Sequence, residues 1–314
     1  MASPAPDPSE LSPAHESNFM SGVVLAITGT FLFALKSIII KLAFAAGADA
    51  DIVLTYRMIL SLPFYAAVLM FDTRKQTGRE RLTRKQILTA MGLGFLGYYL
   101  ASLLDLKGLE LISAQLERLT LFTYPAMIAI LAWMFLGEKI TLNIIFAILL
   151  CYLGIFYMYS QEVTFEGSEN TTRGVALVVG SAISYSCYVV LAKALMQVIG
   201  SRRFTSLAMI GSTVFVMIHF FATNPVSDLY ISWTVGTYCL VLAIVCTVLP
   251  SYLVNEAIVR IGATRTTIIG TVGPVMTMLL AIAILGEPTS RWHIFGMIMV
   301  IIGVRLVAEN RNET

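Results

Sequence analysis

The stretch TYPAMIAILAWMFLGE at residues 123–138 decides the fold, because it returns as VGPVMTMLLAIAILGE at residues 272–287. Both copies have a proline near the start, an apolar run in the middle and Leu-Gly-Glu at the end. Sliding the chain by 149 residues aligns 112–154 with 261–303, and twelve of these 43 positions are identical. Nearer the N-terminus, an offset of 152 pairs Gly22 with Gly174. Matched Pro, Gly and Glu at one spacing indicate an internal repeat.

The composition excludes a soluble enzyme. Of the 314 residues, 57% are hydrophobic and 13% are charged, and the mean hydropathy is +0.81. Soluble domains carry roughly 25% charged residues. The basic residues form no stripe, which argues against nucleic-acid binding. The four cysteines lie in apolar runs without metal-type spacing, so we expect no metal and no cofactor.

The apolar runs are long enough to cross a membrane. A helix needs about 20 apolar residues to span the hydrocarbon layer. The fold class that we predict is an all-α membrane protein with ten transmembrane helices. The predicted spans are 20–45, 52–71, 87–109, 113–135, 140–160, 174–198, 204–222, 231–258, 264–285 and 292–309.

The basic residues of the loops set the expected orientation. Six of them follow the second span, between residues 74 and 85, and taking that loop as cytoplasmic places thirteen Lys and Arg inside and three outside. Both termini are therefore expected in the cytoplasm, in a multi-pass protein of the cell (inner) membrane. Residues 1–19 lack the basic start of a signal peptide and are expected to form a disordered cytoplasmic tail.

The two halves are predicted to be inverted repeats, at residues 20–161 and 174–309. Each half holds five spans, and an odd number places the second half upside down relative to the first. Inverted repeats are typical of alternating-access transporters, which hold substrate near the interface of the repeats.

These features resemble the drug/metabolite transporter superfamily, of the EamA type. The resemblance rests on Thr123-Tyr124-Pro125 to Leu136-Gly137-Glu138 and on Gly273-Pro274 to Leu285-Gly286-Glu287, and it covers about residues 20–309. It implies two five-helix halves, a cavity enclosed by helices 1–4 and 6–9, and export as the direction of transport. Within the superfamily, substrates range from amino acids to nucleotide sugars and drugs.

Five charged residues are predicted to share one layer inside the membrane. At about 1.5 Å per residue, each falls roughly 6–9 Å from the outer boundary. They are Lys36, Arg57, Asp105, Glu117 and Arg118. Buried charges in lipid are costly and either bind substrate or pair with one another. Both interpretations stay open for Lys36 and Asp105, and the functional one is favoured for Glu117 and Arg118.

The neighbours Glu117 and Arg118 suggest separate roles. Glu117 shares a helical face with Tyr124 and is the candidate for proton coupling, whereas Arg118 is expected to pair laterally, with Asp105 as one candidate partner. The layer sums to plus one, which suits a substrate with a carboxylate that arginine can bind through two hydrogen bonds.

Further candidates have a packing explanation beside the functional one. Tyr188 and Tyr252 either line a cavity or pack between helices. Pro125 and Pro274 interrupt helices mid-membrane and act either as hinges or as simple kinks. Residues 92–97 match the dinucleotide pattern Gly-x-Gly-x-x-Gly, but no strand precedes them, so close helix packing explains them better.

The sequence therefore predicts a secondary transporter of small polar metabolites, and not an enzyme. It is expected to export amino acids or related organic anions and zwitterions, with protons as the candidate coupling ion. Two rivals are a broad drug exporter and a non-transporting sensor or accessory subunit. The expected partners are the substrate and the lipid bilayer, without nucleic acid, and a homodimer is left open.

Overall fold

The computed structural model describes residues 13–75, 82–136, 142–166, 168–261 and 263–310, and these residues form helices and turns without a strand. The first half contains α1 (Pro13–Ala45), α2 (Ala50–Lys75), α3 (Arg84–Gly94), the π-helix η2 (Phe95–Leu100), α4 (Ala101–Leu109), α5 (Ala114–Leu121), α6 (Tyr124–Leu136) and α7 (Leu142–Glu166). α1 begins inside the stretch expected to be a tail, with Pro13 at the position in the first turn where proline is favoured.

The second half contains α8 (Ser168–Ile199), α9 (Ser201–Thr223), the 3-10 helix η3 (Val226–Leu229), α10 (Trp233–Ala243), the π-helix η4 (Ile244–Val248) and α11 (Leu249–Ile261). It ends with α12 (Ala263–Gly270), α13 (Gly273–Leu280), the π-helix η5 (Ala281–Leu285) and α14 (Arg291–Asn310). In the described part, seven helical stretches are long and apolar enough to span a membrane, and two shorter apolar helices accompany them. The protein is a multi-pass membrane protein, and the count of ten spans stays a prediction.

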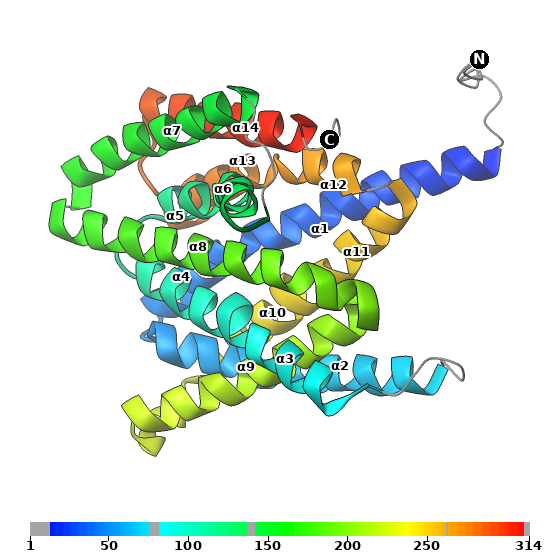
Figure 1. The fold of residues 1–314 in the computed structure, drawn as a ribbon. Helices are drawn as coiled ribbons and strands as arrows, with labels where there is room; N and C mark the ends of the chain where they lie inside the picture. The colour runs from blue at the N-terminus through cyan, green and yellow to red at the C-terminus, as the bar shows by residue number, and fades with distance from the viewer. Residues whose placement is uncertain (1–12, 76–81, 137–141, 167, 262, 311–314) are drawn as a thin grey trace, which may run out of the picture.

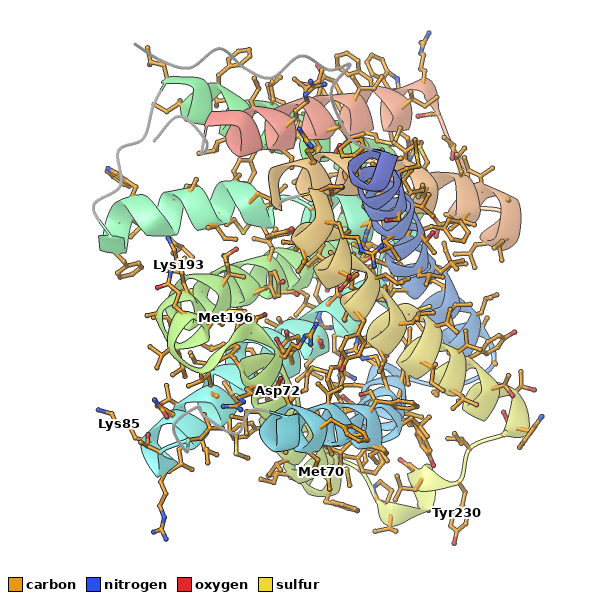
Figure 2. The ribbon with its side chains drawn as sticks, turned by 90° about the vertical axis from the view of Figure 1, so that its right-hand side faces the viewer. Met70, Asp72, Lys85, Lys193, Met196 and Tyr230 are labelled. Atoms are coloured by element: carbon orange, nitrogen blue, oxygen red, sulfur yellow. The ribbon has the colours of Figure 1, made fainter. Side chains whose placement is uncertain are left out.

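The helices run between two opposite ends of the molecule (Figure 1). The start of α1 and the ends of α2, α8 and α11 gather on the right of that view. We call this the basic end, defined by Arg84, Lys85, Arg202, Arg203, Arg260 and Arg265. Figure 2 views the molecule from this end and labels Asp72, Lys85 and Lys193 on α2, α3 and α8. At the left of Figure 1 lies the acidic end, defined by Asp49, Asp51, Glu110, Glu162 and Glu287.

Helix packing follows one plan in both halves. α1 packs against α11 and α13, while α8 packs against α4 and α6. α2 packs on α9, and α7 lies beside α14 at one edge of the molecule (Figure 1). α1 runs from the basic end to the acidic end, whereas α8 runs the opposite way (Figure 1). α1 and α8 therefore have partners at corresponding positions of the sequence and run in opposite directions.

The two glycines paired in the sequence have the same packing role. A β-carbon on Gly22 would lie 2.5 Å from Ile261 and 2.9 Å from Arg260. On Gly174 it would lie 2.5 Å from Ile112 and 3.1 Å from Leu111. Residues 111 and 112 are related to 260 and 261 by the offset of 149. Gly22 thus lets the start of α1 approach the end of α11, and Gly174 lets the start of α8 approach the residues that follow α4. Each glycine therefore allows close packing against the other half of the chain.

Helix interruptions also recur at the offset of 149. The π-helix η2 begins at Phe95 and η4 begins at Ile244. α5 ends at Leu121 and α12 ends at Gly270, and in each case a two-residue turn follows before the next helix. π-helical turns and broken membrane helices are frequent at functional sites, so these interruptions are candidate positions for such a site.

The glycine pattern at residues 92–97 serves helix packing, as the sequence indicates. A β-carbon on Gly94 would lie 2.1 Å from the carbonyl oxygen of Ala208, and one on Gly97 would lie 2.4 Å from the ring of Tyr188. Gly92 has nothing within 4 Å. Two of the three glycines therefore allow α3 and η2 to approach α9 and α8 closely.

Candidate functional site

A cluster of charged side chains lies between α1, α4 and α5. Lys36 Nζ is 2.6 Å from Asp105 Oδ2, and both side chains are largely buried. The neighbouring Ser37 hydroxyl donates to Glu117 Oε2 at 2.6 Å, and Glu117 is fully buried. The structure therefore brings together Lys36, Asp105 and Glu117, which the sequence assigned to one layer, and Lys36 pairs with Asp105 inside the helix bundle.

The carboxyl groups of Asp105 and Glu117 lie within electrostatic range of each other. Asp105 Oδ1 and Glu117 Oε1, the oxygens that do not bond to Lys36 and Ser37, are buried and have no hydrogen-bond partner among the described residues. Two carboxylates buried close together repel each other, and a proton on one of them would relieve that repulsion. These two oxygens are therefore the candidate position for a proton.

Two arginines, the buried Arg57 and the half-buried Arg118, accompany the two carboxyl groups without an ion pair among the described residues. Arg57 is 4% exposed, and its Nε has no hydrogen-bond partner in the described part of the chain. The same holds for Nε of Arg118. Within the described ranges, neither guanidinium has a carboxylate within 4.0 Å. Asp105 pairs with Lys36, and no ion pair between Arg118 and Asp105 is present among the described residues, so the expected pairing of these two is not observed.

Arg118 reaches from the first half of the chain to the second. Its terminal nitrogen lies 3.7 Å from where a β-carbon on Gly273 would stand, at the first residue of α13. Gly273 has no side chain to fill this space. At the positions equivalent to Glu117 and Arg118, the second half carries Thr266 and Thr267, so the charge is confined to one half.

The local sequence explains the bounds of the short helix α5, which carries Glu117 and Arg118. Ser113 caps α5 by accepting the N–H of Leu116, and the helix ends eight residues later at Leu121. Pro125 is the second residue of α6, and Pro274 lies in the first turn of α13. Proline lacks a backbone N–H, and in the first turn of a helix this N–H has no partner within the helix. In each half, the two-residue turn is therefore followed by a helix whose second residue is a proline. The hinge role of both prolines stays a prediction.

Tyrosines form one wall beside the cluster. The ring of Tyr124 stands edge-on to Tyr185 at 5.4 Å, and Tyr185 contacts Tyr188 at 5.8 Å. The Tyr188 hydroxyl donates to the Tyr98 hydroxyl at 3.2 Å. Because the helix is interrupted at residues 122–123, Tyr124 belongs to a different helix from Glu117. The helical face that these two residues were expected to share is therefore not continuous. Tyr252 is half-buried and packs with the core that surrounds Tyr98.

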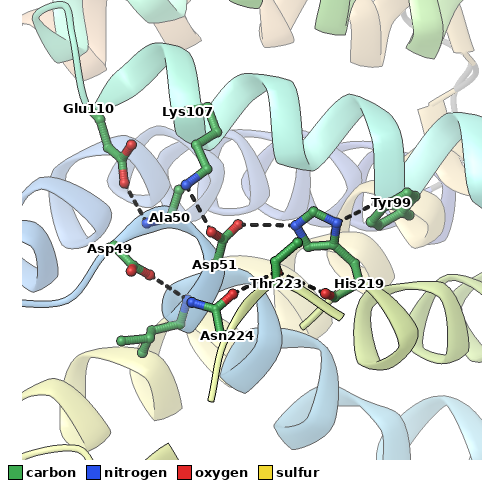
Figure 3. A network of polar contacts seen from close by, with 10 residues as sticks. Asp49, Ala50, Asp51, Tyr99, Lys107, Glu110, His219, Thr223 and Asn224 are labelled. Atoms are coloured by element: carbon green, nitrogen blue, oxygen red, sulfur yellow. Dashed lines mark hydrogen bonds and ion pairs between the residues drawn. The ribbon is translucent and has the colours of Figure 1, made fainter. Parts of the chain in front are cut away.

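A second polar network lies at the acidic end (Figure 3). Asp51 accepts from Lys107 Nζ at 2.9 Å and lies 3.4 Å from His219 Nε2. The other ring nitrogen of His219 is 3.0 Å from the Tyr99 hydroxyl. Glu110 accepts the N–H of Ala50 at the start of α2. These ion pairs and hydrogen bonds tie α2, α4 and α9 together.

Sequence reasoning missed Ser37, because a lone hydroxyl in an apolar run carries no signal of its own. It noted the Glu of both Leu-Gly-Glu signatures but assigned neither a role. Glu138 lies outside the described residues. Glu287 accepts backbone N–H groups at the start of α5, 2.7 Å from Ala114 and 3.3 Å from Gln115. In the described ranges, no group of three or more His, Cys, Asp and Glu could hold a metal ion.

Known proteins are similar in sequence to this chain over almost its whole length. The sequence model of the EamA-like transporter family matches residues 20–160 and 172–308. The uncharacterized transporter YcbK of Bacillus subtilis is 30% identical over 284 residues, which cover 88% of this chain and 89% of the relative. The uncharacterized transporter sll1319 of Synechocystis is 23% identical over 313 residues, 92% and 93% of the two chains.

One solved crystal structure has the same fold. It aligns with a TM-score of 0.60 over 93% of this chain and 98% of its own, at 15% sequence identity. At this identity the likeness concerns the fold alone. The two family matches and the similarity to named transporters over most of the chain establish that this protein belongs to the EamA-like transporter family.

Proposed function

We propose that this protein is a secondary transporter that exports small zwitterionic or anionic metabolites across the cell membrane by alternating access. The observation that carries the proposal is a pair of arginines without ion pairs among the described residues, the buried Arg57 and the half-buried Arg118, beside two buried carboxyl groups. A charged side chain in a membrane helix costs roughly 2.5–3.5 kcal/mol at the centre of the bilayer. A bound carboxylate would offset this cost, because it can accept two hydrogen bonds from a guanidinium.

The proposed architecture is ten transmembrane helices in two inverted repeats, at residues 20–161 and 174–309. The recurring helix breaks, the matched packing of Gly22 and Gly174, and the opposite directions of α1 and α8 support it. Arg118 beside Gly273 then lies at the interface of the repeats, where such transporters hold substrate. We assign the basic end to the cytoplasm, with both termini, because short loops rich in Lys and Arg remain inside.

Proton coupling follows from the charges of the cluster. When the Asp105–Glu117 pair holds a proton, the five charged residues sum to plus two, and without it they sum to plus one. The ammonium group of an amino acid can replace that proton at the carboxyl pair while its carboxylate binds Arg118. Substrate and proton then exclude each other, which is the condition for antiport and lets an inward proton gradient drive export. A pure anion would instead bind together with the proton, and the inward proton gradient would then oppose its export, so the antiport scheme applies to zwitterions.

The alternatives differ in what they require of Arg118. A broad exporter of lipophilic drugs would use the tyrosine wall and depend little on this arginine. A sensor or accessory subunit would move no solute at all. The relatives are named transporters, which favours transport over an enzymatic role.

An apolar groove of about 640 Å³ between α2 and α9 contains none of the charged residues, so we do not assign the substrate to it.

The test is metabolite analysis of the medium from cells that overexpress the parental protein, Arg118→Gln or Arg173→Gln. Arg173 is an exposed arginine at the start of α8 and is the matched control. We expect one class of amino acids or related anions to accumulate outside with the parental protein and with Arg173→Gln, and not with Arg118→Gln at equal membrane abundance. Accumulation with all three proteins would refute a substrate role for Arg118.

A further inference from the structure

We propose that Glu287 is a positioning residue that closes the acidic end of the transporter by holding the first turn of α5, and that its release opens the site to that side. The proposal rests on the proposed function, since it assumes alternating access. Glu287 comes from the second half of the chain, whereas α5 carries Glu117 and Arg118 in the first half.

The bond pattern shows a contact built for the start of a helix. The first N–H groups of a helix have no partner within it. Glu287 Oε1 accepts the N–H of Ala114 at 2.7 Å, and Oε2 accepts that of Gln115 at 3.3 Å. A carboxylate at this position also interacts favourably with the helix dipole. The hydroxyl of Thr289 adds a hydrogen bond to the side-chain oxygen of Gln115 at 3.2 Å.

The backbone conformation at residue 286, directly before Glu287, explains why this position is a glycine. Its φ of 66° is in the left-handed region, which a residue with a side chain adopts only with strain. This conformation ends η5 and lets the N–H of Glu287 bond to the carbonyl of Ala281 at 3.2 Å. The turn thus directs the Glu287 side chain back across the acidic end onto α5. The Leu-Gly-Glu signature of the second half is therefore a helix stop followed by a cap for another helix.

A second glutamate, from the first half, supports the same turn. Glu162 near the end of α7 accepts the Ser113 hydroxyl at 2.6 Å and also the Ser113 N–H. Glu162 and Glu287 are close enough to repel one another, and Lys41 lies within electrostatic range to balance them. Glu162 links α5 only to its own half, whereas Glu287 links the two halves.

Because Glu287 links the two halves, its contact with α5 can act as a gate. Alternating access requires the two halves to separate at one end while they close at the other. At the acidic end, separation must break the bonds between Glu287 and α5. When they break, α5 loses the contact that fixes its first turn, and Glu117 and Arg118, one turn further along, become accessible from that side.

The first arm of the test needs no substrate. Hydrogen exchange of the purified full-length protein is measured by mass spectrometry over residues 113–121. Glu287→Ala is expected to speed exchange at Ala114 and Gln115 by about tenfold or more, while exchange in α9 stays unchanged. Glu287→Asp should recover part of the protection. The control Glu169→Ala removes an exposed carboxylate, also at the start of a helix at this end, and should leave residues 113–121 unchanged.

The second arm distinguishes a gate from general loosening. All variants carry alanine at the four native cysteines and Thr120→Cys, since the buried Thr120 hydroxyl has no partner among the described residues. A membrane-impermeant thiol reagent is added to right-side-out and to inside-out vesicles. With Glu287→Ala we expect labelling from the acidic end to rise about tenfold and labelling from the basic end to fall. Equal increases from both sides, or no change in either arm, overturn the proposal.

The proposed function does not depend on this result. Loss of export in Arg118→Gln combined with unchanged exchange and labelling in Glu287→Ala would remove the gate and leave the substrate site. Faster exchange and one-sided labelling combined with normal export by Arg118→Gln would retain the gate and remove the proposed substrate site.

Discussion

Lys36 and Asp105 form an ion pair at 2.6 Å deep in the helix bundle, and this pair leaves Arg57 and Arg118 without carboxylate partners. The cluster holds three cations and two carboxyl groups, and one cation is matched with one carboxylate. The second carboxyl group, on Glu117, accepts a hydrogen bond from Ser37 instead of from an arginine. Under the proposed function, these two guanidinium groups bind the substrate.

Breaking the Lys36–Asp105 pair should cost stability in a coupled way. Lys36→Met leaves a buried carboxylate, and Asp105→Asn leaves a buried ammonium, and both are expected to lower the melting temperature. The double variant should be more stable than the sum of the two losses predicts, with a coupling free energy of about 1–3 kcal/mol. Thermal unfolding in detergent measures all four proteins. Additive losses would contradict a direct pair.

Removing an unpaired arginine should stabilise the protein while it impairs transport. Arg57→Met deletes a buried charge that has no carboxylate partner, so we expect a higher melting temperature and a loss of substrate flux. Arg203→Met is the matched control, because Arg203 is equally buried but bonds to Asp72 at 2.7 Å. That substitution should lower the melting temperature. The same thermal scan checks both, and a destabilised Arg57→Met would show that Arg57 has a structural role.

Glu117→Gln should remove the pH dependence of export. The amide has the shape of a protonated carboxyl group but cannot release a proton. Under the antiport scheme, export of a zwitterion should rise when the pH gradient across the membrane is steepened in the parental protein and stay flat in Glu117→Gln. Flux in vesicles at several external pH values measures this. A parental pH profile retained by Glu117→Gln would exclude Glu117 as the proton carrier.

Gly94→Ala should disrupt the packing of α3 on α9. The added methyl group would lie 2.1 Å from the backbone oxygen of Ala208, which cannot move away as a side chain would. We expect a loss of about 1–3 kcal/mol in the free energy of unfolding. Gly92→Ala is the control, since its methyl group meets nothing within 4 Å. Expression level and melting temperature report the difference, and equal behaviour of both variants would contradict the packing.

The proximity of Lys36, Asp105 and Glu117 was predictable because position along a helix depends only on the rise per residue. Their common layer in the membrane stays a prediction. The partner of each group depends on helix rotation, so the pairing of Asp105 with Lys36 instead of Arg118 was not predictable. The role of Glu287 was hidden for a similar reason. It depends on the left-handed turn at Gly286, which sends the side chain to a helix 173 residues earlier in the chain.

The central claim is that Arg118 binds the anionic group of the substrate, and flux through purified protein in proteoliposomes tests it most directly. Parental protein, Arg118→Gln and Arg173→Gln are reconstituted at equal density, and exchange of labelled amino acids is measured. The account predicts saturable exchange for the parental protein and Arg173→Gln, and at least about 30-fold weaker apparent affinity for Arg118→Gln, from a lost contact of about 2 kcal/mol. Exchange by Arg118→Gln with parental affinity and rate would contradict it.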